Sequence, residues 1–575
     1  MTINFTHIYF KETKMFTTPK PTPALCLYQI FILSAILLLA GSASAYSGGD
    51  GTRLNPYQIA DVNDLLYLGS DEPNYGKYFI LVADINLAGY DFNTAVIAPY
   101  TSDQYGTQGV PFSGSFDGAC HKISNLTING NRGSDYGYAC YGLFGQTDYI
   151  ENLDEYGYYW NEIKNINLEN VRISSTDNYS IIGGLIGDND GVPITNCHIN
   201  INGNSYSEYI GGLAGYNSGN INNCSSEGNI FITSYPGMGA LMVAGGLIGD
   251  NGDDIINSHS DCNVSCDANN IAGWVHIGGL VGLNGPYDDY GYTNINNCYS
   301  TGNIYGDGNM AGYFKIGGLI GTNESAYYSL QQSTINRCFS ASPVIVTVNV
   351  SGDNLIGGLV GSNYGEINDC YSTGPVTDLA LYCDGLGGLV GNNSGYQSLP
   401  AIIRNCYSVG KVTLLNSSGY AGGLVGSQYW SPIITHSYFL DVNGPANGYG
   451  MPLTDAQMKQ QASFVGWDFV GETINGTEDV WWLLENVTYP KLNWQRKLPS
   501  GGCGGGGPGG PGGTGSGDGG IYFPDYNFDN FVNFLDFAIF ADAWLTENPF
   551  ISLDNDNDVD INDLKIFCDH WLKGL

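Results

Sequence analysis

Residues 245–251 read Gly-Gly-Leu-Ile-Gly-Asp-Asn, and variants of this string recur through the middle of the chain. The motif Gly-Gly-Leu-(Ile/Val/Ala)-Gly occurs eight times, and a degenerate copy, Tyr-Gly-Leu-Phe-Gly, occupies residues 141–145. Successive copies are separated by 28 to 40 residues. Two residues after each copy stands an amide: Asn189, Asn217, Asn251, Asn284, Asn323, Asn363, Asn393 and Gln428. Such self-similarity is typical of repeat architectures.

After the amide, a second pattern, Ile-x-x-Cys-x-Ser-x-Gly-x-(Ile/Val), is clearest at residues 221–230, 295–304, 367–376 and 403–412. These runs are β-rich, bounded by Gly and Asn, and too short for helices. A repeat with one apolar face buries that face by stacking on its neighbours. The variable period argues against a propeller, whose blades are nearly constant in length. We therefore predict an all-β fold, a parallel β-helix (solenoid) of roughly ten coils.

Within this solenoid, the leucines of the motif are predicted to form one interior column and the amides a hydrogen-bonded ladder at the ~4.8 Å strand spacing. The leucines are Leu185, Leu213, Leu247, Leu280, Leu319, Leu359, Leu389 and Leu424. Residues 141–440 hold the repeats, and residues 46–140 would supply the N-terminal cap and first coils.

Six of the 14 cysteines share one repeat position: Cys197, Cys224, Cys298, Cys338, Cys370 and Cys406. Ser258 and Ser437 replace them in two copies, which indicates a small, buried column. Parallel side chains point the same way and give a poor disulfide dihedral, so we favour free thiols over bridges. Cys262 and Cys266 lie outside the column and could pair with each other in an exported protein.

The composition excludes several function classes. Nineteen Lys and Arg against 55 Asp and Glu give a net charge of −36, which argues against binding to nucleic acid or anionic membranes. Residues 25–40 form an apolar run after three lysines and end in small residues at Ala43 and Ala45. This layout predicts a secretory signal over residues 1–45, with a membrane anchor as the alternative. With no second apolar span, the mature chain should be extracellular or at the cell surface.

Residues 441–498 break the repeat. Thr454 to Gln457 fit a capping box that opens a short helix reaching about Ser463. Four tryptophans follow, at positions 467, 481, 482 and 494. They form either an aromatic platform for sugars or, as we favour, a cap over the last coil, which any solenoid needs.

Residues 499–520 are nearly all Gly, Pro and Ser and form a flexible linker. After the linker, two segments offset by 27 residues each place an acidic loop before an apolar stretch with helical spacing. In both loops, oxygen-bearing side chains fall at positions 1, 3, 5, 9 and 12. Such a spacing can wrap a hard cation. The alternative is a pair of solvated acidic loops without an ion.

The eight glycine-leucine strings resemble the GLUG repeats of bacterial surface proteins. This resemblance covers roughly residues 141–440 and supports architecture more than activity, because such repeats occur in adhesins and as accessories to peptidases.

Residues 521–575 resemble a type I dockerin, since both loops and both helices match in register. The resemblance implies that Ca²⁺ is the cofactor and that a cohesin-like scaffold protein is the partner. Position 1 of the second loop is Ser552 where the family usually has Asp, which predicts a weaker second site. The implied ligands are Asp525, Asn527, Asp529, Asn533 and Asp536 in the first loop, and Ser552, Asp554, Asp556, Asp560 and Asp563 in the second.

Catalytic motifs are scarce. The chain has no Gly-x-Ser-x-Gly elbow and no His-Glu-x-x-His, so simple serine-hydrolase and zinc-peptidase chemistry is not indicated. Paired acids in loops remain as candidates for polysaccharide chemistry. They are Asp188 with Asp190, Asp250 with Asp253 and Asp254, and Asp288 with Asp289.

The leading hypothesis is a secreted, non-catalytic solenoid that its calcium-loaded tail attaches to a partner. One alternative is a polysaccharide-degrading or carbohydrate-binding β-helix that the tail delivers to a scaffold. Another is an adhesin that uses a tyrosine-rich flank.

Overall fold

The computed structural model describes residues 46–496, except 104–105, 132–137, 155–156, 178, 207, 234–240, 270–271, 287–291, 326–331, 396–398 and 416–418. The expected signal segment of residues 1–45, the Gly/Pro-rich segment of residues 499–520 and the acidic tail of residues 521–575 therefore lie outside the described residues.

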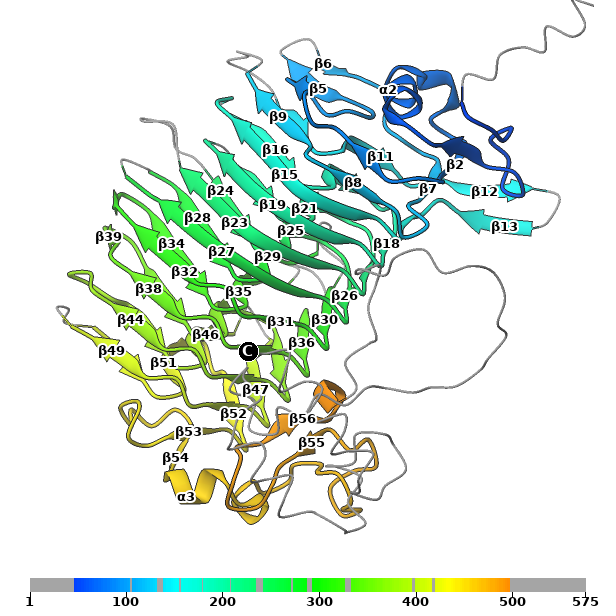
Figure 1. Ribbon diagram of the computed structural model, residues 1–575. Coiled ribbons are helices and arrows are strands. Elements are labelled where there is room, and N and C mark those ends of the chain that lie inside the picture. The colour runs from blue at the N-terminus through cyan, green and yellow to red at the C-terminus, as the bar shows by residue number, and fades with distance from the viewer. Residues whose placement is uncertain are drawn as a thin grey trace, which may run out of the picture.

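The chain winds into a solenoid of four sheets, which we number in the order that each coil passes through them (Figure 1). Sheet 1 has twelve strands. They are β1 (Tyr57–Ile59), β2 (Tyr78–Leu81), β7 (Ser115–Asp117), β14 (Ile163–Lys164), β18 (Ile194–Thr195), β22 (Ile221–Asn222), β26 (Ile255–Ile256), β30 (Asn294–Asn296), β36 (Thr334–Asn336), β42 (Glu366–Asn368), β47 (Ile402–Arg404) and β52 (Ile433–Thr435).

Sheet 2 has the longest strands. They are β3 (Ile85–Asn86), β4 (Asp91–Phe92), β8 (Lys122–Ser124), β9 (Thr127–Gly130), β15 (Asn167–Ser175), β19 (His198–Ser205), β23 (Ser225–Thr233), β27 (His259–Asp267), β31 (Tyr299–Ser300), β32 (Ile304–Asp307), β37 (Phe339–Ser340), β38 (Val344–Val346), β43 (Tyr371–Ser372), β44 (Val376–Asp378), β48 (Tyr407–Ser408), β49 (Val412–Leu414), β53 (Tyr438–Leu440) and β54 (Met451–Leu453). The strand is undivided in β15, β19, β23 and β27, whereas in the two coils before them and in the coils from β31 to β49 it is divided in two.

Sheets 3 and 4 flank the glycine-leucine motif. Sheet 3 contains β5 (Tyr100–Asp103), β6 (Gly106–Gln108), β10 (Ala139–Tyr141), β16 (Ser180–Gly183), β20 (Tyr209–Gly211), β24 (Leu241–Gly245), β28 (Trp274–Gly278), β34 (Tyr313–Gly317), β40 (Asn354–Gly357), β45 (Gly385–Gly387) and β50 (Ala421–Gly422). Sheet 4 contains β11 (Phe144–Asp148), β17 (Ile186–Asp190), β21 (Ala214–Asn217), β25 (Ile248–Asn251), β29 (Val281–Asn284), β35 (Ile320–Asn323), β41 (Val360–Asn363), β46 (Val390–Ser394) and β51 (Val425–Tyr429). The strands of the four sheets pair in parallel, except that β5 pairs antiparallel with β10 and β6 in sheet 3.

The two predicted columns are present inside the solenoid. All eight motif leucines are completely buried in one continuous core. The amides form a ladder in which each Nδ2 donates to the Oδ1 of the next coil, from Asn189 to Asn393, at 2.7–2.9 Å. The prediction of stacked leucines and amides is confirmed.

The cysteine column is also confirmed, and all its thiols are free. The residue before each column member adopts a positive φ, for example Asn297 at 54°. From Cys224 to Cys406, the backbone N–H of each column member then donates to the side chain of the column member in the next coil. Thus Cys298 N donates to Cys338 Sγ at 3.4 Å, and Cys406 N donates to Ser437 Oγ at 3.2 Å. A thiol and a hydroxyl serve equally as small acceptors, which explains the exchange of Cys and Ser.

The suggested pairing of Cys262 with Cys266 is wrong. Both residues lie on β27 and both are free and buried. Four residues of extended strand separate their Cα atoms by about 13 Å, well beyond the reach of a disulfide.

The N-terminal end is closed by the helix α2 (Val62–Ser70) and a 3₁₀ turn at Glu72–Asn74. Asp61 caps the helix by accepting hydrogen bonds from the backbone N–H groups of Asn63 and Asp64, which have no partner within the helix. Leu65 and Leu68 are buried against the first coils. A β12–β13 hairpin (Glu151–Asp154 and Gly157–Trp160) extends beside this end (Figure 1).

The C-terminal segment begins with the predicted capping box, in which Thr454 and Gln457 exchange hydrogen bonds. The helix α3 (Asp455–Met458) is shorter than expected, because a separate 3₁₀ turn at Gln461–Ser463 replaces its second half. The segment ends with the pair β55 (Trp481–Trp482) and β56 (Lys491–Leu492) and a 3₁₀ turn at Asn493–Arg496. A short parallel pair, β33 (Asn309–Met310) and β39 (Asn349–Val350), completes the fold.

Candidate functional site

The tryptophan-rich segment does not form a sugar platform. Trp467 and Trp481 are completely buried, and they pack with Tyr371, Tyr407 and Tyr438 in a second apolar core. These tyrosines belong to a column of stacked rings on sheet 2, which starts at His259 and continues through Tyr299 and Phe339 with centroids 4.6–5.0 Å apart.

The same segment covers more of the solenoid than its last coil. Trp481 Nε1 donates to Asp369 Oδ1 at 3.0 Å, and Trp494 Nε1 donates to Arg337 O at 2.9 Å. Both acceptors lie several coils before the end. The expected end cap is therefore also a lateral brace along sheets 1 and 2.

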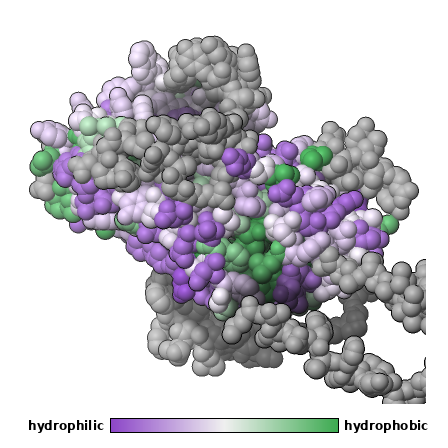
Figure 2. Space-filling model, turned by 90° about the horizontal axis from the view of Figure 1, so that it is seen from above, coloured by the Kyte–Doolittle hydropathy of each residue, from purple (hydrophilic) through white to green (hydrophobic). Residues whose placement is uncertain are grey.

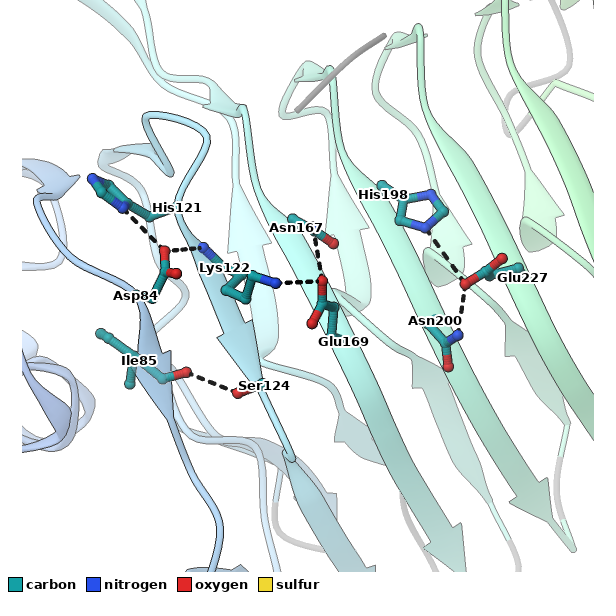
Figure 3. A network of polar contacts seen from close by, with 10 residues as sticks. All are labelled: Asp84, Ile85, His121, Lys122, Ser124, Asn167, Glu169, His198, Asn200 and Glu227. Atoms are coloured by element: carbon teal, nitrogen blue, oxygen red, sulfur yellow. Dashed lines mark hydrogen bonds and ion pairs between the residues drawn. The ribbon is translucent and has the colours of Figure 1, made fainter. Parts of the chain in front are cut away.

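A row of charged side chains crosses the outer face of sheet 2 near the N-terminal end (Figure 3). Lys122 Nζ lies 2.8 Å from Glu169, His121 lies 3.1 Å from Asp84, and Asn200 donates to Glu227 at 2.6 Å. These pairs join neighbouring coils, and their side chains are about 36–59% exposed. Because water screens such contacts, we assign the row to the surface of the fold rather than to a site.

A stronger candidate is the concave surface where the outer faces of sheets 3 and 4 meet, which we call the crease. One side is a column on sheet 3, in register from coil to coil: Cys140, Ile181, Tyr209, Val243, His276, Lys315, Leu355 and Gly385. The other side is a column on sheet 4: Gln146, Asp188, Tyr216, Asp250, Leu283, Thr322, Ser362, Asn392 and Ser427.

The two columns touch across the crease. His276 Nδ1 lies 2.7 Å from Thr322 Oγ1, and the rings of Tyr209 and Tyr216 are 6.3 Å apart. The last glycine of each motif makes the approach possible, since a Cβ on Gly282 would lie 2.6 Å from Val243 Cγ1. The crease therefore depends on the repeated sequence itself.

Three titratable groups in the crease have strongly perturbed protonation. Burial raises the pKa of Asp188 to about 6. Burial and the charge of Glu324 raise the pKa of Asp250 to about 7. Burial and the neighbouring ammonium of Lys315 lower the pKa of His276, so this imidazole is neutral at pH 7. Perturbed groups in a cleft mark a functional-site candidate.

Of the acids that the sequence paired, Asp188 and Asp190 both lie on β17, and the charge of Asp190 adds to the raised pKa of Asp188. Asp188 and Asp250 lie on strands of sheet 4, not in variable loops as predicted. Asp254 instead accepts hydrogen bonds from the N and Nδ2 atoms of Asn294 at 2.8 and 2.9 Å. Asp288 and Asp289 lie outside the described residues. His276 and Lys315 are not among the candidates predicted from the sequence. Each stands two residues before a Gly-Gly pair, so aligning the repeats would have placed both in the same column.

Two hollows lie away from the crease. One, of about 590 Å³, lies on sheet 1 near the first coils and is lined by Arg53, Tyr78, Asp117, Glu162 and Lys164 among others. Glu162 and Lys164 form an ion pair with each other. The second, of about 390 Å³, lies at the last coil beside His436 and Tyr449.

The calcium ligands expected in residues 525–563 lie outside the described part of the chain. Within the described ranges, no group of three or more His, Cys, Asp or Glu side chains is placed to hold a metal ion. Among the helices of those ranges, none has the length and apolar composition needed to cross a bilayer.

Comparison with known proteins identifies the repeat. The GLUG motif is matched at residues 206–230, 352–377 and 383–413. The chain carries GLUG repeats.

Two relatives share part of this region. A protein of Evansella cellulosilytica that is named a Gly-rich membrane protein is 30% identical over 171 residues, which are 28% of this chain and 17% of that protein. Halomucin of Haloquadratum walsbyi is 28% identical over 238 residues, which are 35% of this chain and 2% of that protein. The alignments thus cover only a small part of the length of both relatives.

Among solved structures, one from Bacteroides ovatus described as an immunoglobulin A1 protease aligns with a TM-score of 0.35 and 17% identity. The alignment covers 79% of this chain and 97% of that chain. At this level of similarity we infer nothing about function from it.

Proposed function

We propose that this chain is an exported, non-catalytic binding protein that holds a surface carbohydrate in its crease and is fixed to a partner through its tail. The observation that carries the proposal is the crease itself. It runs along the GLUG coils, and its side chains change from one coil to the next, whereas the surrounding glycines and amides repeat.

The proposal includes the termini. The apolar leader of residues 1–45 would export the chain to the cell surface or the extracellular medium. The acidic tail would bind two Ca²⁺ ions and dock onto a cohesin-type scaffold, as its resemblance to dockerins implies. The linker of residues 499–520 would let the solenoid move about that anchor.

A calorimetric titration of the chain from Tyr46 to Leu575 with Ca²⁺ tests the anchor. The matched variant carries Asp529→Ala and Asp556→Ala, which remove one central ligand from each loop. We expect heat from calcium binding in the parent chain and its loss in the variant. If the parent chain binds no Ca²⁺ at millimolar concentration, the dockerin part of the proposal is wrong.

A second candidate is polysaccharide degradation. It is favoured by Asp250, whose pKa of about 7 suits a group that donates or accepts a proton near neutral pH. The test is incubation with a panel of polysaccharides, followed by the same assay on Asp250→Asn. Cleavage by the parent chain that disappears in the variant would make the chain an enzyme and overturn the non-catalytic proposal.

A further inference from the structure

The side chain of Lys315 places its positive charge inside the crease. This side chain extends from β34, and the residue is only 3% exposed. The Nζ atom lies 5.4 Å from the centre of the Trp274 ring and 5.3 Å from that of Tyr364. Among the described residues of 46–496, this ammonium forms no direct ion pair and no hydrogen bond.

The three N–H donors of this ammonium form no hydrogen bond with the described side chains. Aromatic faces stabilise a cation, but they do not replace the three hydrogen bonds that water would accept from it. The Nζ atom itself is not fully buried, so water reaches it, and a ligand that brings acceptor oxygens to Nζ can take the place of that water.

Beside this donor lies a flat aromatic surface. Trp274 begins β28 and Tyr313 begins β34, and the two residues are paired in register. Their rings stack with centroids 4.1 Å apart and planes 17° apart. Trp274 is 46% exposed and Tyr313 is 37% exposed, so the platform is open to solvent. The C–H faces of sugar rings pack on surfaces of this kind.

Hydrogen-bond acceptors also lie close to Lys315 and the aromatic platform. Glu324 follows the last residue of β35 and is exposed, and Lys315 and Asp250 both interact with it electrostatically. Although the residue as a whole is exposed, burial of its carboxyl among the neighbouring side chains raises the pKa of Glu324, and the cation of Lys315 partly opposes that rise. The neutral His276, bound to Thr322, adds no charge to the floor. One donor group and two carboxyls around an aromatic platform match the hydroxyls of a sugar.

Charge decides which kind of sugar fits. The chain carries a net charge of −36, and Asp250, Glu324 and Asp353 outnumber the one cation near the platform. A polyanionic glycan would meet repulsion over the whole surface, whereas a neutral one would not.

We propose that Trp274 and Tyr313 bind the apolar face of one ring in an uncharged glycan, while Lys315 donates to its hydroxyl groups and Glu324 accepts from them. This inference rests on the proposed carbohydrate-binding function and names its site and ligand class.

The test is calorimetry or affinity electrophoresis of the full chain with neutral oligosaccharides (cellohexaose, xylohexaose and mannohexaose) and with a carboxylated one, oligogalacturonate. We expect binding to at least one neutral probe and weaker binding to oligogalacturonate. Lys315→Met and Trp274→Ala should each weaken that binding at least tenfold. The controls are Lys122→Met and Tyr305→Ala, a surface lysine and a tyrosine of similar exposure on sheet 2, and both should bind within twofold of the parent chain.

The outcomes distinguish the carbohydrate-binding function from the proposed site and ligand class. No binding to any probe contradicts the carbohydrate function as well as the site. Neutral binding that survives Trp274→Ala leaves the function and refutes the site. A preference for oligogalacturonate refutes the ligand class. Because Trp274 is largely exposed, its removal leaves the fold intact and keeps the test valid even if Lys315→Met is unstable.

Discussion

The buried amide ladder gives the most direct test of what holds the coils together. Asn284 is completely buried, and its Nδ2 donates to Asn323 Oδ1 and to Thr293 Oγ1, both at 2.8 Å. Its Oδ1 accepts from Asn251 Nδ2 at 2.9 Å. Asn284→Ala removes all three bonds without changing the charge.

The expected loss of stability follows from these contacts. Three hydrogen bonds contribute about 1 kcal/mol each, and the Asn323 acceptor left buried and unsatisfied adds about 1–3 kcal/mol. Asn251 keeps a second acceptor, the carbonyl of Asp253 at 2.6 Å, and adds little. The total is about 4–6 kcal/mol, a large share of the stability of an ordinary domain.

A matched control comes from a second, exposed amide ladder on sheet 2. Asn303 Nδ2 donates to Asn263 Oδ1 at 2.8 Å in full contact with water. Asn303→Ala should therefore cost less than about 1 kcal/mol, because water replaces the lost partner.

Guanidinium unfolding followed by far-ultraviolet circular dichroism compares the two variants. Since solenoids open locally, hydrogen exchange of peptides from the neighbouring coils should accompany it. We expect the unfolding midpoint to fall much further in Asn284→Ala than in Asn303→Ala, with protection lost around residues 244–251 and 318–323. Equal midpoints would refute the view that the interior ladder stabilises the stacking more than a surface ladder does.

Three further outcomes are expected. Gly279→Ala should prevent normal folding, because its Cβ would lie 2.1 Å from a backbone oxygen, whereas Gly76→Ala, with its nearest contact at 3.6 Å, should melt like the parent chain. Asp250→Asn should be more stable than the parent by about 1–4 kcal/mol at pH 8, because the parent must ionise a carboxyl whose folded pKa of about 7 exceeds the usual 3.8. This advantage should disappear as the pH falls from 7 to 4 and the carboxyl of the folded parent is protonated. A stability difference that stays constant from pH 4 to 9 would contradict the raised pKa. The thiol of Cys298 and the others of its column should react with Ellman's reagent only after unfolding, because all of them are buried and out of reach of the reagent. Rapid labelling of the native chain would exclude a buried column.

The interior of the solenoid could be predicted from the sequence because its features repeat along one chain. Leucines and amides at a fixed offset from Gly-Gly can only stack if the coils are parallel and in register. The left-handed turn before the cysteines is signalled only in part, since Asn196, Asn223, Asn297 and Asn405 suit a positive φ, whereas Arg337 precedes Cys338 in the same conformation.

The lateral brace could not be predicted, because its contacts join distant segments. Trp494 and Arg337 are 157 residues apart, and Tyr371 meets Gln495 across 124. A cluster of tryptophans fits both a binding platform and a core. Only the burial of Trp467 and Trp481 between stacked tyrosines decides between them.

The crease was missed for a different reason. Its two walls come from sheets 3 and 4, and the contacts across it join different coils, as His276 does with Thr322 and Asp250 with Glu324. The fifth residue of the motif suggests a tight turn when it is considered alone. In the structure it is the floor on which the side chain of the preceding coil rests.

This arrangement shows where the repeat can vary without losing its fold. In each coil the residue between the last glycine and the amide points into the crease, and the nine positions hold seven residue types, from Asp188 and Tyr216 to Leu283 and Ser427. The glycine before it cannot carry a Cβ, and the amide after it is fixed by the ladder. The side chain stays accessible at Gln146, Asp188, Tyr216, Asp250 and Leu283, whereas it is buried at Thr322, Ser362, Asn392 and Ser427. Because stacking constrains both neighbours but not this residue, recognition can be encoded there in the coils where its side chain stays accessible.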